Sequence, residues 1–300
     1  MNLKAHKSDV CKVSVVIPAY NEAGAIADVI RDVRGALERA GYEYEILVVD
    51  DGSRDETASK AQQAGARVIR HKENRGSGAS RKTGILASRG DWILMIDADN
   101  TYPAGAIPEI LAPLEEFSQV IGARLVEKGT HKWLRTFAKE LIRRLACFLV
   151  GKAIPDLNSG LRAFRKEDML PFLHLVPDGF SCVSSMTLAF LTNGLPVAFV
   201  PIDYYSRTGK SKFHPIKDTY KYILTVVRIV TYFAPLKVFM PICLGLMGLG
   251  LIKGLMDLIC TGSLQESDII LILTGVMVGA IGILADLIVT QGKGRHGSKG

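Results

Sequence analysis

The chain contains 300 residues, of which 48% are hydrophobic, and it has a formal net charge of +7 at pH 7. This length provides for one large domain with a full core and an appendage, and the five dispersed cysteines, without Cys-x-x-Cys spacing, argue against a disulfide framework. The positive charge is compatible with nucleic acid, an anionic membrane surface or phosphate-bearing substrates, and the apolar stretches after residue 234 favour the membrane and argue against nucleic acid.

Strands and helices alternate through the first hundred residues. The start of the chain, 1–12, is polar and of mixed charge, and no secretory signal peptide is predicted there. Apolar, β-branched runs predict strands, and apolar residues spaced three and four apart predict helices. In chain order we expect a strand at 13–17, a helix at about 23–40, a strand at 44–49, a helix at about 55–64, a strand at 67–70, a helix ending near 88 and a strand at 92–96. This alternation predicts an α/β fold with a mostly parallel sheet and helices on both of its faces.

Three of these strands end in polar clusters. The clusters contain Tyr20, Glu22, Asp50, Asp51, Asp97 and Asp99. The carboxyl ends of parallel strands meet at one edge of a sheet, where open α/β sheets bind their ligands. Carboxylates gathered there would repel one another, so a bound cation with a polyhydroxyl ligand is the favoured explanation.

Asp97 and Asp99 are the strongest metal-binding candidates. They follow a buried-type strand at spacing i, i+2, so in an extended segment both side chains point the same way and can reach one hard cation. For an isolated Asp-x-Asp the alternative is a solvated turn. The glycine-rich segment 74–78 is not followed by Gly-Lys-Ser/Thr, and no Gly-x-Gly-x-x-Gly follows the first strand, which argues against an ATPase and a dinucleotide dehydrogenase.

Four segments together resemble family 2 glycosyltransferases with the Rossmann-like GT-A fold. They are Val-Val-Ile-Pro-Ala-Tyr-Asn-Glu at 15–22, Val-Val-Asp-Asp-Gly-Ser at 48–53, Asn74-x-Gly76-x-Gly78 and Asp97-Ala98-Asp99. The resemblance covers about 13–212 and implies a nucleotide-diphosphate sugar as donor. It implies that the base and ribose lie among Pro18, Tyr20, Glu22, Val49 and Asp51. It also implies that the Asp97-Ala98-Asp99 turn holds Mg²⁺ or Mn²⁺ on the diphosphate.

Thr101 stands where dolichyl-phosphate mannose synthases often have glutamine. Direct ligation of the metal by Thr101 is therefore one alternative, and a hydroxyl that acts through a water molecule is the other.

The next predicted strand, 119–124, ends in Arg124, which we assign to the donor site. The following segment, 128–152, is basic and amphipathic. It is too short in apolar residues to span a bilayer, and it suits either the membrane surface or a core-facing helix with a solvated basic face.

Asp156-Leu157-Asn158-Ser159-Gly160-Leu161-Arg162 resembles the Asp-x-x-Ser-Gly-Phe-Arg signature of polyprenyl-phosphate glycosyltransferases. A Ser-Gly turn lets backbone N–H groups approach an anion, and an arginine offers a planar fork to a phosphate. We therefore expect Ser159 and Arg162 to bind the phosphate of the acceptor. Asp156 could orient that arginine, contact the transferred sugar or cap a turn.

A late strand is predicted at 197–202, and three cations surround Gly209 after it. Such a run is usually a solvated loop. Here it matches the family pattern Arg…Gly-x-Ser-Lys, which implies that Arg207 and Lys212 close over the diphosphate and exclude water.

The last part of the chain is predicted to be membrane-bound. An amphipathic segment at 215–233 suits a juxtamembrane helix, and two apolar stretches near 238–259 and 269–289 are each long enough to cross a bilayer. Buried core helices are the alternative to this hairpin. The expected domains are a glycosyltransferase domain at 1–212, a juxtamembrane helix at 213–235 and two transmembrane helices at 236–300.

The link between the two spans, 260–268, has no Lys or Arg, whereas Lys293, Arg295 and Lys299 lie in the tail. The positive-inside tendency then places the catalytic domain and both termini in the cytoplasm. Within the first span Lys253 and Asp257 can pair at i, i+4. Asp286 in the second span could mark a subunit contact or reach the interface, and a homo-oligomer through these helices stays open.

The motifs together predict metal-dependent, inverting transfer of one hexose, from GDP-mannose or a UDP-hexose, to a dolichyl-type or undecaprenyl-type phosphate at the cytoplasmic membrane face. Asp97, Asp99, Asp156 and Arg162 are the candidate catalytic residues. The acceptor is a phosphate monoester with a second pKa of about 6, so it is largely ionised at neutral pH and needs no strong general base.

Two alternatives compete with this function. A processive polysaccharide synthase of the same family would carry Gln-x-x-Arg-Trp, but Trp133 is preceded by Thr130-His131-Lys132. A non-catalytic membrane scaffold would not be expected to keep both the acidic and the basic signatures. The sequence identifies neither the sugar nor the base.

Overall fold

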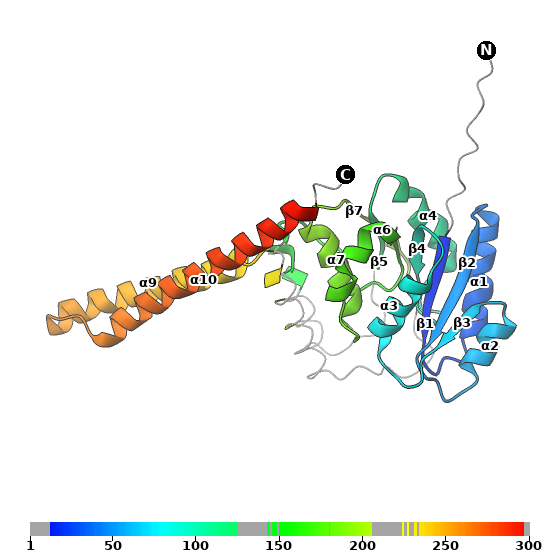
Figure 1. Ribbon diagram of the computed structural model, residues 1–300, viewed down its shortest axis with the longest axis horizontal. Coiled ribbons are helices and arrows are strands. Elements are labelled where there is room, and N and C mark those ends of the chain that lie inside the picture. Colours follow the sequence, from blue (N-terminus) through cyan, green and yellow to red (C-terminus); the bar gives the residue numbers. More distant parts are fainter. Residues whose placement is uncertain are drawn as a thin grey trace, which may run out of the picture. The chain divides into compact units, whose positions relative to one another are not determined.

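The computed structural model describes residues 13–124, 150–179, 181–205 and 234–296, together with single positions between 143 and 148 and between 224 and 232. Four predictions lie outside these residues: the polar start at 1–12, most of the basic segment at 128–152, the cations Arg207 and Lys212, and most of the amphipathic segment at 215–233. The chain divides into two compact units, Met1–Thr225 and Val226–Gly300 (Figure 1).

A seven-stranded sheet with the order β3-β2-β1-β4-β6-β5-β7 forms the first unit. The strands are β1 (Val13–Ala19), β2 (Tyr44–Asp50), β3 (Arg67–Arg70), β4 (Trp92–Met95), β5 (Gln119–Arg124), β6 (Arg162–Arg165) and β7 (Val197–Ile202). Strands β1 to β4 are parallel, as are β5 and β7, whereas β6 runs antiparallel to both β4 and β5. The predicted mostly parallel sheet is confirmed, and the reversed strand β6 is a feature that the sequence did not predict.

Helices cover both faces of this sheet, as predicted. They are α1 (Ile26–Arg39), α2 (Thr57–Gln63), α3 (Ser77–Ala87), α4 (Ile107–Leu111), α6 (Lys166–Met169) and α7 (Cys182–Thr192), with short 3-10 turns at Ala104–Ala106, Ala112–Glu115 and Leu170–Leu175. One core cluster joins α1 and α4 to the sheet through residues such as Ile30, Leu37 and Ile107. A second cluster lies on the other face, where Ile85 of α3 and Phe190 of α7 pack against strand residues.

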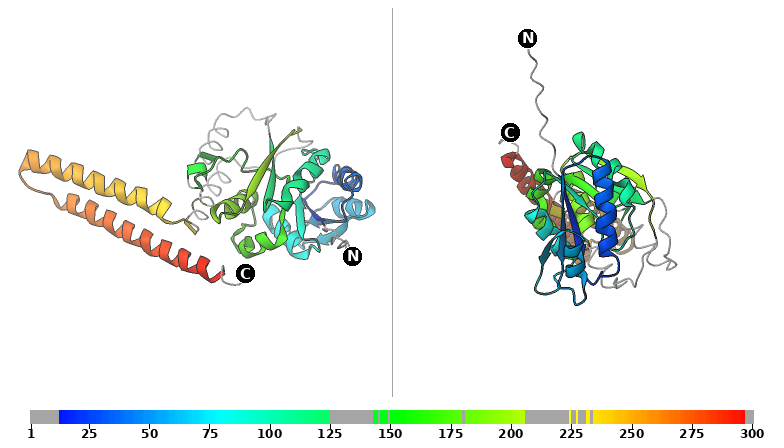
Figure 2. Two further views of the ribbon diagram at one scale, coloured as in Figure 1. Left: turned by 90° about the horizontal axis from the view of Figure 1, so that it is seen from above. Right: turned by 90° about the vertical axis from the view of Figure 1, so that its right-hand side faces the viewer.

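The second unit is a hairpin of α9 (Leu236–Thr261) and α10 (Glu266–His296), seen side by side in Figure 2. Gly262 ends α9 in the left-handed conformation, with φ 75°. A Cβ on Gly275 or Gly279 of α10 would overlap Met247 or Cys243 of α9, so these glycines permit close helix packing. Leu236–Thr261 and Glu266–Thr290 are each long and apolar enough to cross a membrane, which agrees with the two predicted spans.

Lys253 of α9 is paired as predicted, but with an additional partner. Its Nζ lies 2.6 Å from Asp257 Oδ2, 2.7 Å from Asp268 Oδ1 and 2.9 Å from Ser267 Oγ. Asp268 is only 1% exposed. The lysine therefore joins the two helices near the end that carries the tight turn.

Candidate active site

The carboxyl ends of β1, β2 and β4 lie at one edge of the sheet because these strands are parallel, and Ala19 is in register with Asp50. Three hydrogen bonds, each 2.9 Å long, join the turns after β1 and β2. The amide of Asn21 donates to Ser53 Oγ, and the amide of Glu22 donates to Thr57 Oγ1. The amide of Arg54 donates to Asn21 Oδ1. Asn21 adopts a left-handed conformation, with φ 53°, which asparagine tolerates better than most residues. Pro18, Tyr20 and Glu22, the predicted base and ribose contacts, lie half-exposed at this edge.

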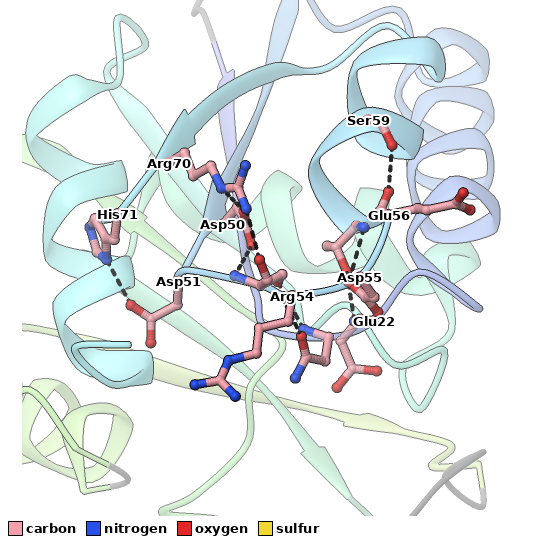
Figure 3. A network of polar contacts seen from close by, with 12 residues as sticks. Glu22, Asp50, Asp51, Arg54, Asp55, Glu56, Ser59, Arg70 and His71 are labelled. Carbon is pink, nitrogen blue, oxygen red and sulfur yellow. Dashed lines mark hydrogen bonds and ion pairs between the residues drawn. The ribbon is translucent and has the colours of Figure 1, made fainter. Parts of the chain in front are cut away.

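Asp51 contacts both His71 (Figure 3) and the glycine-rich loop. Its Oδ1 accepts a hydrogen bond from the amide of Arg75 at 3.0 Å, and its Oδ2 accepts one from the amide of Gly76 at 2.8 Å. His71 Nδ1 lies 2.7 Å from Asp51 Oδ1, and its Nε2 lies 3.0 Å from Thr83 Oγ1. Asp51 is only 3% exposed, so its side chain is an internal support of the glycine-rich loop. The sequence-based assignment of Asp51 to the nucleotide base did not include this structural contact.

Asp50 and Arg70 stabilise the turn that follows β2 (Figure 3). Asp50 is fully buried, accepts a hydrogen bond from the amide of Ser53 at 3.1 Å and lies 3.1 Å from Arg70 Nε. Arg70 Nη2 in turn donates to the carbonyl of Ser53 at 2.8 Å. Val49 is also fully buried, so its side chain belongs to the core and any contact with a nucleotide is left to its main chain.

Asp97, which follows β4, is paired with Arg81 of α3. Arg81 Nη2 lies 2.5 Å from Asp97 Oδ1, and its Nη1 lies 3.5 Å from Cys182 Sγ at the start of α7. Burial alone would lower the pKa of Arg81, but Cys182 and Asp97 raise it above its ordinary value. The Asp97 side chain is 30% exposed, so the carboxylate faces the edge of the sheet while a buried cation fixes one of its oxygens.

The Ser159-Gly160 turn lies against Asp97. A Cβ built on Gly160 would lie 2.8 Å from Asp97 Cγ and would overlap Oδ2, so only glycine permits this approach. The amide of Gly160 donates to Tyr102 Oη at 2.6 Å, and Tyr102 is 7% exposed. The predicted acceptor signature is therefore brought to the predicted metal-binding aspartate.

Thr101 contacts Asp99, the second aspartate of the motif. Its hydroxyl donates to Asp99 Oδ1 at 2.6 Å, and its amide lies 3.3 Å from the same oxygen. Thr101 is fully buried. The Thr101 hydroxyl is thus buried and bonded to one oxygen of Asp99 in this structure.

Asp156 orients an arginine, but the arginine is Arg124 and not Arg162. Arg124 Nε and Nη2 donate to Asp156 Oδ2 and Oδ1 at 2.6 and 2.9 Å, and the amide of Asn158 donates to Oδ1 at 2.9 Å. Burial raises the pKa of Asp156, but the hydrogen bonds and charge of Arg124 outweigh it and lower the pKa below its usual value. The Arg124 guanidinium also stacks over Tyr204, 5.2 Å from the ring centroid, so it is held at the end of β5 in a fixed orientation.

The expected contact of Arg162 with the acceptor phosphate is not what the structure shows. Arg162 is fully buried and donates to the carbonyls of Ser159 and Val183 and to the hydroxyl of Thr187. Burial, and then the charge of Arg81, lowers the pKa of Arg162 to about 10. Ser159 is buried as well, and its hydroxyl donates to the carbonyl of Leu161. Both side chains are therefore buried and bonded to protein groups in this structure.

The donor set of Asp97 and Asp99 fits a hard divalent cation. Both carboxylates are half-exposed at one strand end and offer only oxygen. Among the residues that the structure describes, no group of three or more His, Cys, Asp or Glu side chains could hold a metal ion. The two aspartates would thus supply part of the coordination shell, and a diphosphate with water would supply the rest, as is usual for Mg²⁺. The side chain of Ala98 between them is buried in the core.

Sequence reasoning missed His71, Arg81, Tyr102 and Tyr204, which hold the predicted residues in place. Arg81 alone left a signal, because it shares the buried face of α3 with Gly78 and Ile85 at spacings of three and four. An arginine at such a position requires a buried partner. The other three contacts join segments far apart in the sequence.

Comparison with known protein families identifies both units. The model described as "Glycosyl transferase family 2" matches residues 14–169, and the model described as "GtrB C-terminal hairpin" matches residues 234–290. The second match contains all of α9 and most of α10.

Two relatives are informative. The chain is 34% identical over 211 residues to "Glycosyltransferase AglJ" from Haloferax volcanii, an alignment that covers 69% of this chain and 68% of that protein. It is 38% identical over 169 residues to "Undecaprenyl-phosphate 4-deoxy-4-formamido-L-arabinose transferase" from an Enterobacter species, covering 54% of this chain and 51% of that protein. The chain thus spans only about half the length of the second relative.

Solved structures share the fold. Glucosyl-3-phosphoglycerate synthase from Mycobacterium tuberculosis, in complex with Mn²⁺, uridine-diphosphate-glucose and phosphoglyceric acid, matches with a TM-score of 0.58 at 23% identity, covering 73% of this chain and 80% of that chain. Mannosyl-3-phosphoglycerate synthase from Rubrobacter xylanophilus matches with a TM-score of 0.57 at 24% identity, covering 74% and 73%. With the family matches, these likenesses lead to one conclusion: the chain belongs to glycosyl transferase family 2, with a GT-A sheet and a GtrB-type C-terminal hairpin.

Proposed function

We propose that this glycosyltransferase moves one sugar from a nucleotide-diphosphate donor to a polyprenyl phosphate at the cytoplasmic membrane face, with Mg²⁺ or Mn²⁺ held by Asp97 and Asp99. The observation that carries the proposal is the position of these two carboxylates at the strand-end edge, in a chain that also has an apolar helical hairpin. The undecaprenyl-phosphate transferase to which the chain is 38% identical, and the uridine-diphosphate-glucose and Mn²⁺ bound by a structural relative, support the acceptor, donor and metal classes.

The donor side of the reaction is assigned to the edge formed by β1, β2 and β4. We assign the half-exposed Tyr20 and Glu22 to contacts with the base and ribose. The hydrogen bonds of Asp51 to the amides of Arg75 and Gly76 support the assignment of the glycine-rich loop to the same site. A divalent cation bound to Asp97 and Asp99 would neutralise the charge that develops on the leaving diphosphate. The contact with Arg81 fixes the orientation of the Asp97 carboxylate for this task.

The acceptor side requires positioning more than proton transfer. An oxygen of the ionised polyprenyl phosphate bonds to the anomeric carbon, while the bond from that carbon to the nucleoside diphosphate breaks and the diphosphate leaves with its electron pair. No proton need be removed, because the acceptor is already an anion at neutral pH. A single displacement of this kind inverts the anomeric centre, and alignment of the two reactants supplies much of the rate enhancement.

Arg124 is the cation that we assign to the reacting groups in place of Arg162. It lies at the carboxyl end of β5, where Asp156 and the ring of Tyr204 fix its guanidinium plane. A guanidinium held in this way meets a phosphate at low entropic cost. The proposed orientation, with the catalytic unit and both chain ends in the cytoplasm, keeps this site on the side where nucleotide sugars are made.

The test is transfer of label from a panel of radioactive UDP-hexoses and GDP-mannose to polyprenyl phosphate, followed by extraction of the lipid. Wild-type protein should label the lipid with at least one donor, EDTA should abolish the transfer, and added Mn²⁺ or Mg²⁺ should restore it. Asp99→Ala should remove activity, while Asp28→Ala, which changes an exposed carboxylate on α1, should not. Transfer that survives both EDTA and Asp99→Ala would contradict the proposal, and a ladder of sugar polymers would favour a processive synthase.

A further inference from the structure

Arg162 is a buried cation, and its four hydrogen bonds within the described part of the chain all go to uncharged oxygens. Its Nε and Nη2 donate to the carbonyl of Ser159 at 3.1 and 2.5 Å. Its Nη1 donates to the carbonyl of Val183 at 2.7 Å and to Thr187 Oγ1 at 2.8 Å. The planar fork thus joins the Ser159-Gly160 turn to the first two turns of α7. A residue that binds a phosphate must present its donors to solvent, and Arg162 has no exposed surface.

The Ser159-Gly160 turn is the element that this fork fixes, and it reaches the metal-binding carboxylate. The peptide that carries the Ser159 carbonyl also carries the Gly160 amide, because one peptide unit contains both. The Gly160 amide donates to Tyr102 at 2.6 Å, and the Gly160 Cα faces Asp97 without room for a side chain. Arg162 and Tyr102 therefore hold opposite sides of a single planar group that packs on Asp97.

From this geometry we infer that Arg162 is a positioning residue that presses the Ser159-Gly160 turn against Asp97 and so sets the orientation of the metal-binding carboxylate. It is not a ligand of the acceptor phosphate. The inference rests on the proposed function, because it assigns Asp97 to the metal. Replacing the Arg162 guanidinium should therefore change the half-saturating metal concentration of the enzyme and leave its affinity for the acceptor unchanged.

Lysine is the informative replacement. It keeps the positive charge, but a single ammonium cannot join the Ser159 carbonyl to both acceptors on α7 as a planar guanidinium does. Groups that orient metal ligands from behind typically change metal affinity by about 10- to 100-fold when they are removed. We therefore expect Arg162→Lys to raise the half-saturating Mn²⁺ concentration by about tenfold.

Arg165→Lys is the matched control. Arg165 belongs to the same strand, and it also donates to backbone carbonyls, those of Leu114 and Glu115, at 2.6 to 3.0 Å. It lies at the other end of β6, opposite Trp92. Its replacement removes a comparable carbonyl contact without touching the turn, so the half-saturating Mn²⁺ concentration should stay within about twofold of wild type.

The experiment measures three quantities for wild type, Arg162→Lys, Thr187→Val and Arg165→Lys: the half-saturating Mn²⁺ concentration for sugar transfer, the KM for polyprenyl phosphate, and Mn²⁺ binding by calorimetry in the presence of UDP or GDP. Thr187→Val removes one acceptor of the fork at nearly constant volume and should shift the Mn²⁺ response in the same direction, by about two- to threefold. This second variant decides the matter if Arg162→Lys does not fold. The calorimetric shift should parallel the kinetic one without any turnover.

A raised KM for polyprenyl phosphate with an unchanged Mn²⁺ response in Arg162→Lys would overturn the inference and return Arg162 to the acceptor site. An unchanged Mn²⁺ response in both Arg162→Lys and Thr187→Val would overturn it as well. Failure of the proposed function looks different: wild-type protein would then transfer no sugar to the lipid.

Discussion

The Gly160→Ala substitution places a methyl group where the Asp97 carboxylate now lies. The added Cβ would be 2.8 Å from Asp97 Cγ and closer still to Oδ2. Carbon atoms in contact are normally about 3.5 to 4.0 Å apart, so the carboxylate must move by about 1 Å. Asp97 is half-exposed, so its carboxylate has room to move, but the movement also weakens its ion pair with the buried Arg81.

A displacement of about 1 Å in a catalytic constellation typically lowers the rate by about 100-fold. This corresponds to about 2.7 kcal/mol of lost transition-state stabilisation. The fold should lose stability as well, because the displaced carboxylate leaves the buried Arg81 with a weaker partner. We therefore expect a large loss of activity together with a lower melting temperature, with the rates compared well below the unfolding transition of both proteins.

The assay compares the initial rate of sugar transfer at saturating donor and Mn²⁺, together with thermal unfolding, for wild type and Gly160→Ala. Gly105→Ala is the matched control, because a Cβ at Gly105 meets no atom within 4 Å. If Gly160→Ala keeps a rate within about threefold of wild type and the same Mn²⁺ response, the contact between this turn and Asp97 has no role in catalysis and the reasoning fails.

Three other predictions follow from the same contacts. The folded-state pKa of Asp156 is lowered, so its ionised form stabilises the fold above the unfolded pKa of about 3.9, and this contribution is lost as the pH falls through the folded pKa. Asp156→Asn should therefore lower the free energy of unfolding by about 1 to 3 kcal/mol at pH 7, as measured by thermal unfolding, and by progressively less below about pH 4. A difference in this free energy that does not depend on pH would contradict the pairing with Arg124. His71→Ala should raise the KM for the donor about tenfold without changing the KM for the acceptor, because Asp51 loses a charge-assisted hydrogen bond; equal changes in both constants would refute this. Cys260, an exposed thiol at the turn of the hairpin, should react with a membrane-impermeant maleimide in intact cells, and labelling only after lysis would reverse the proposed topology.

Much of the fold could be predicted because its parallel strands are continuous apolar runs, separated by helices with one apolar face. β6 and α7 could not. β6 has only four residues, two of them arginine, and shows no alternation. α7 is buried on all sides and contains serine and threonine on its inner faces, so no apolar stripe marks it as a helix.

The residues of the site also divide into those that could be predicted from the sequence and those that could not. Asp97 and Asp99 could be found because the residues that follow parallel strands must meet at one edge, whatever the details of packing. Their supports could not be found, because pairs such as Arg81 with Asp97 or Arg124 with Asp156 join separate elements whose contact depends on the finished fold. Arg162 is an example: its residue type and motif suggested a ligand of the acceptor phosphate, whereas its burial supports the positioning role inferred above.

The central claim is that this chain adds one sugar to a polyprenyl phosphate. The most direct test is mass spectrometry of the lipid extracted after purified protein has been incubated with Mn²⁺, polyprenyl phosphate and the donors that label it. A single new species is expected, heavier than the acceptor by the mass of one sugar residue and absent with Asp99→Ala. An unmodified lipid with every donor, or a series of species with repeated sugar additions, would contradict it.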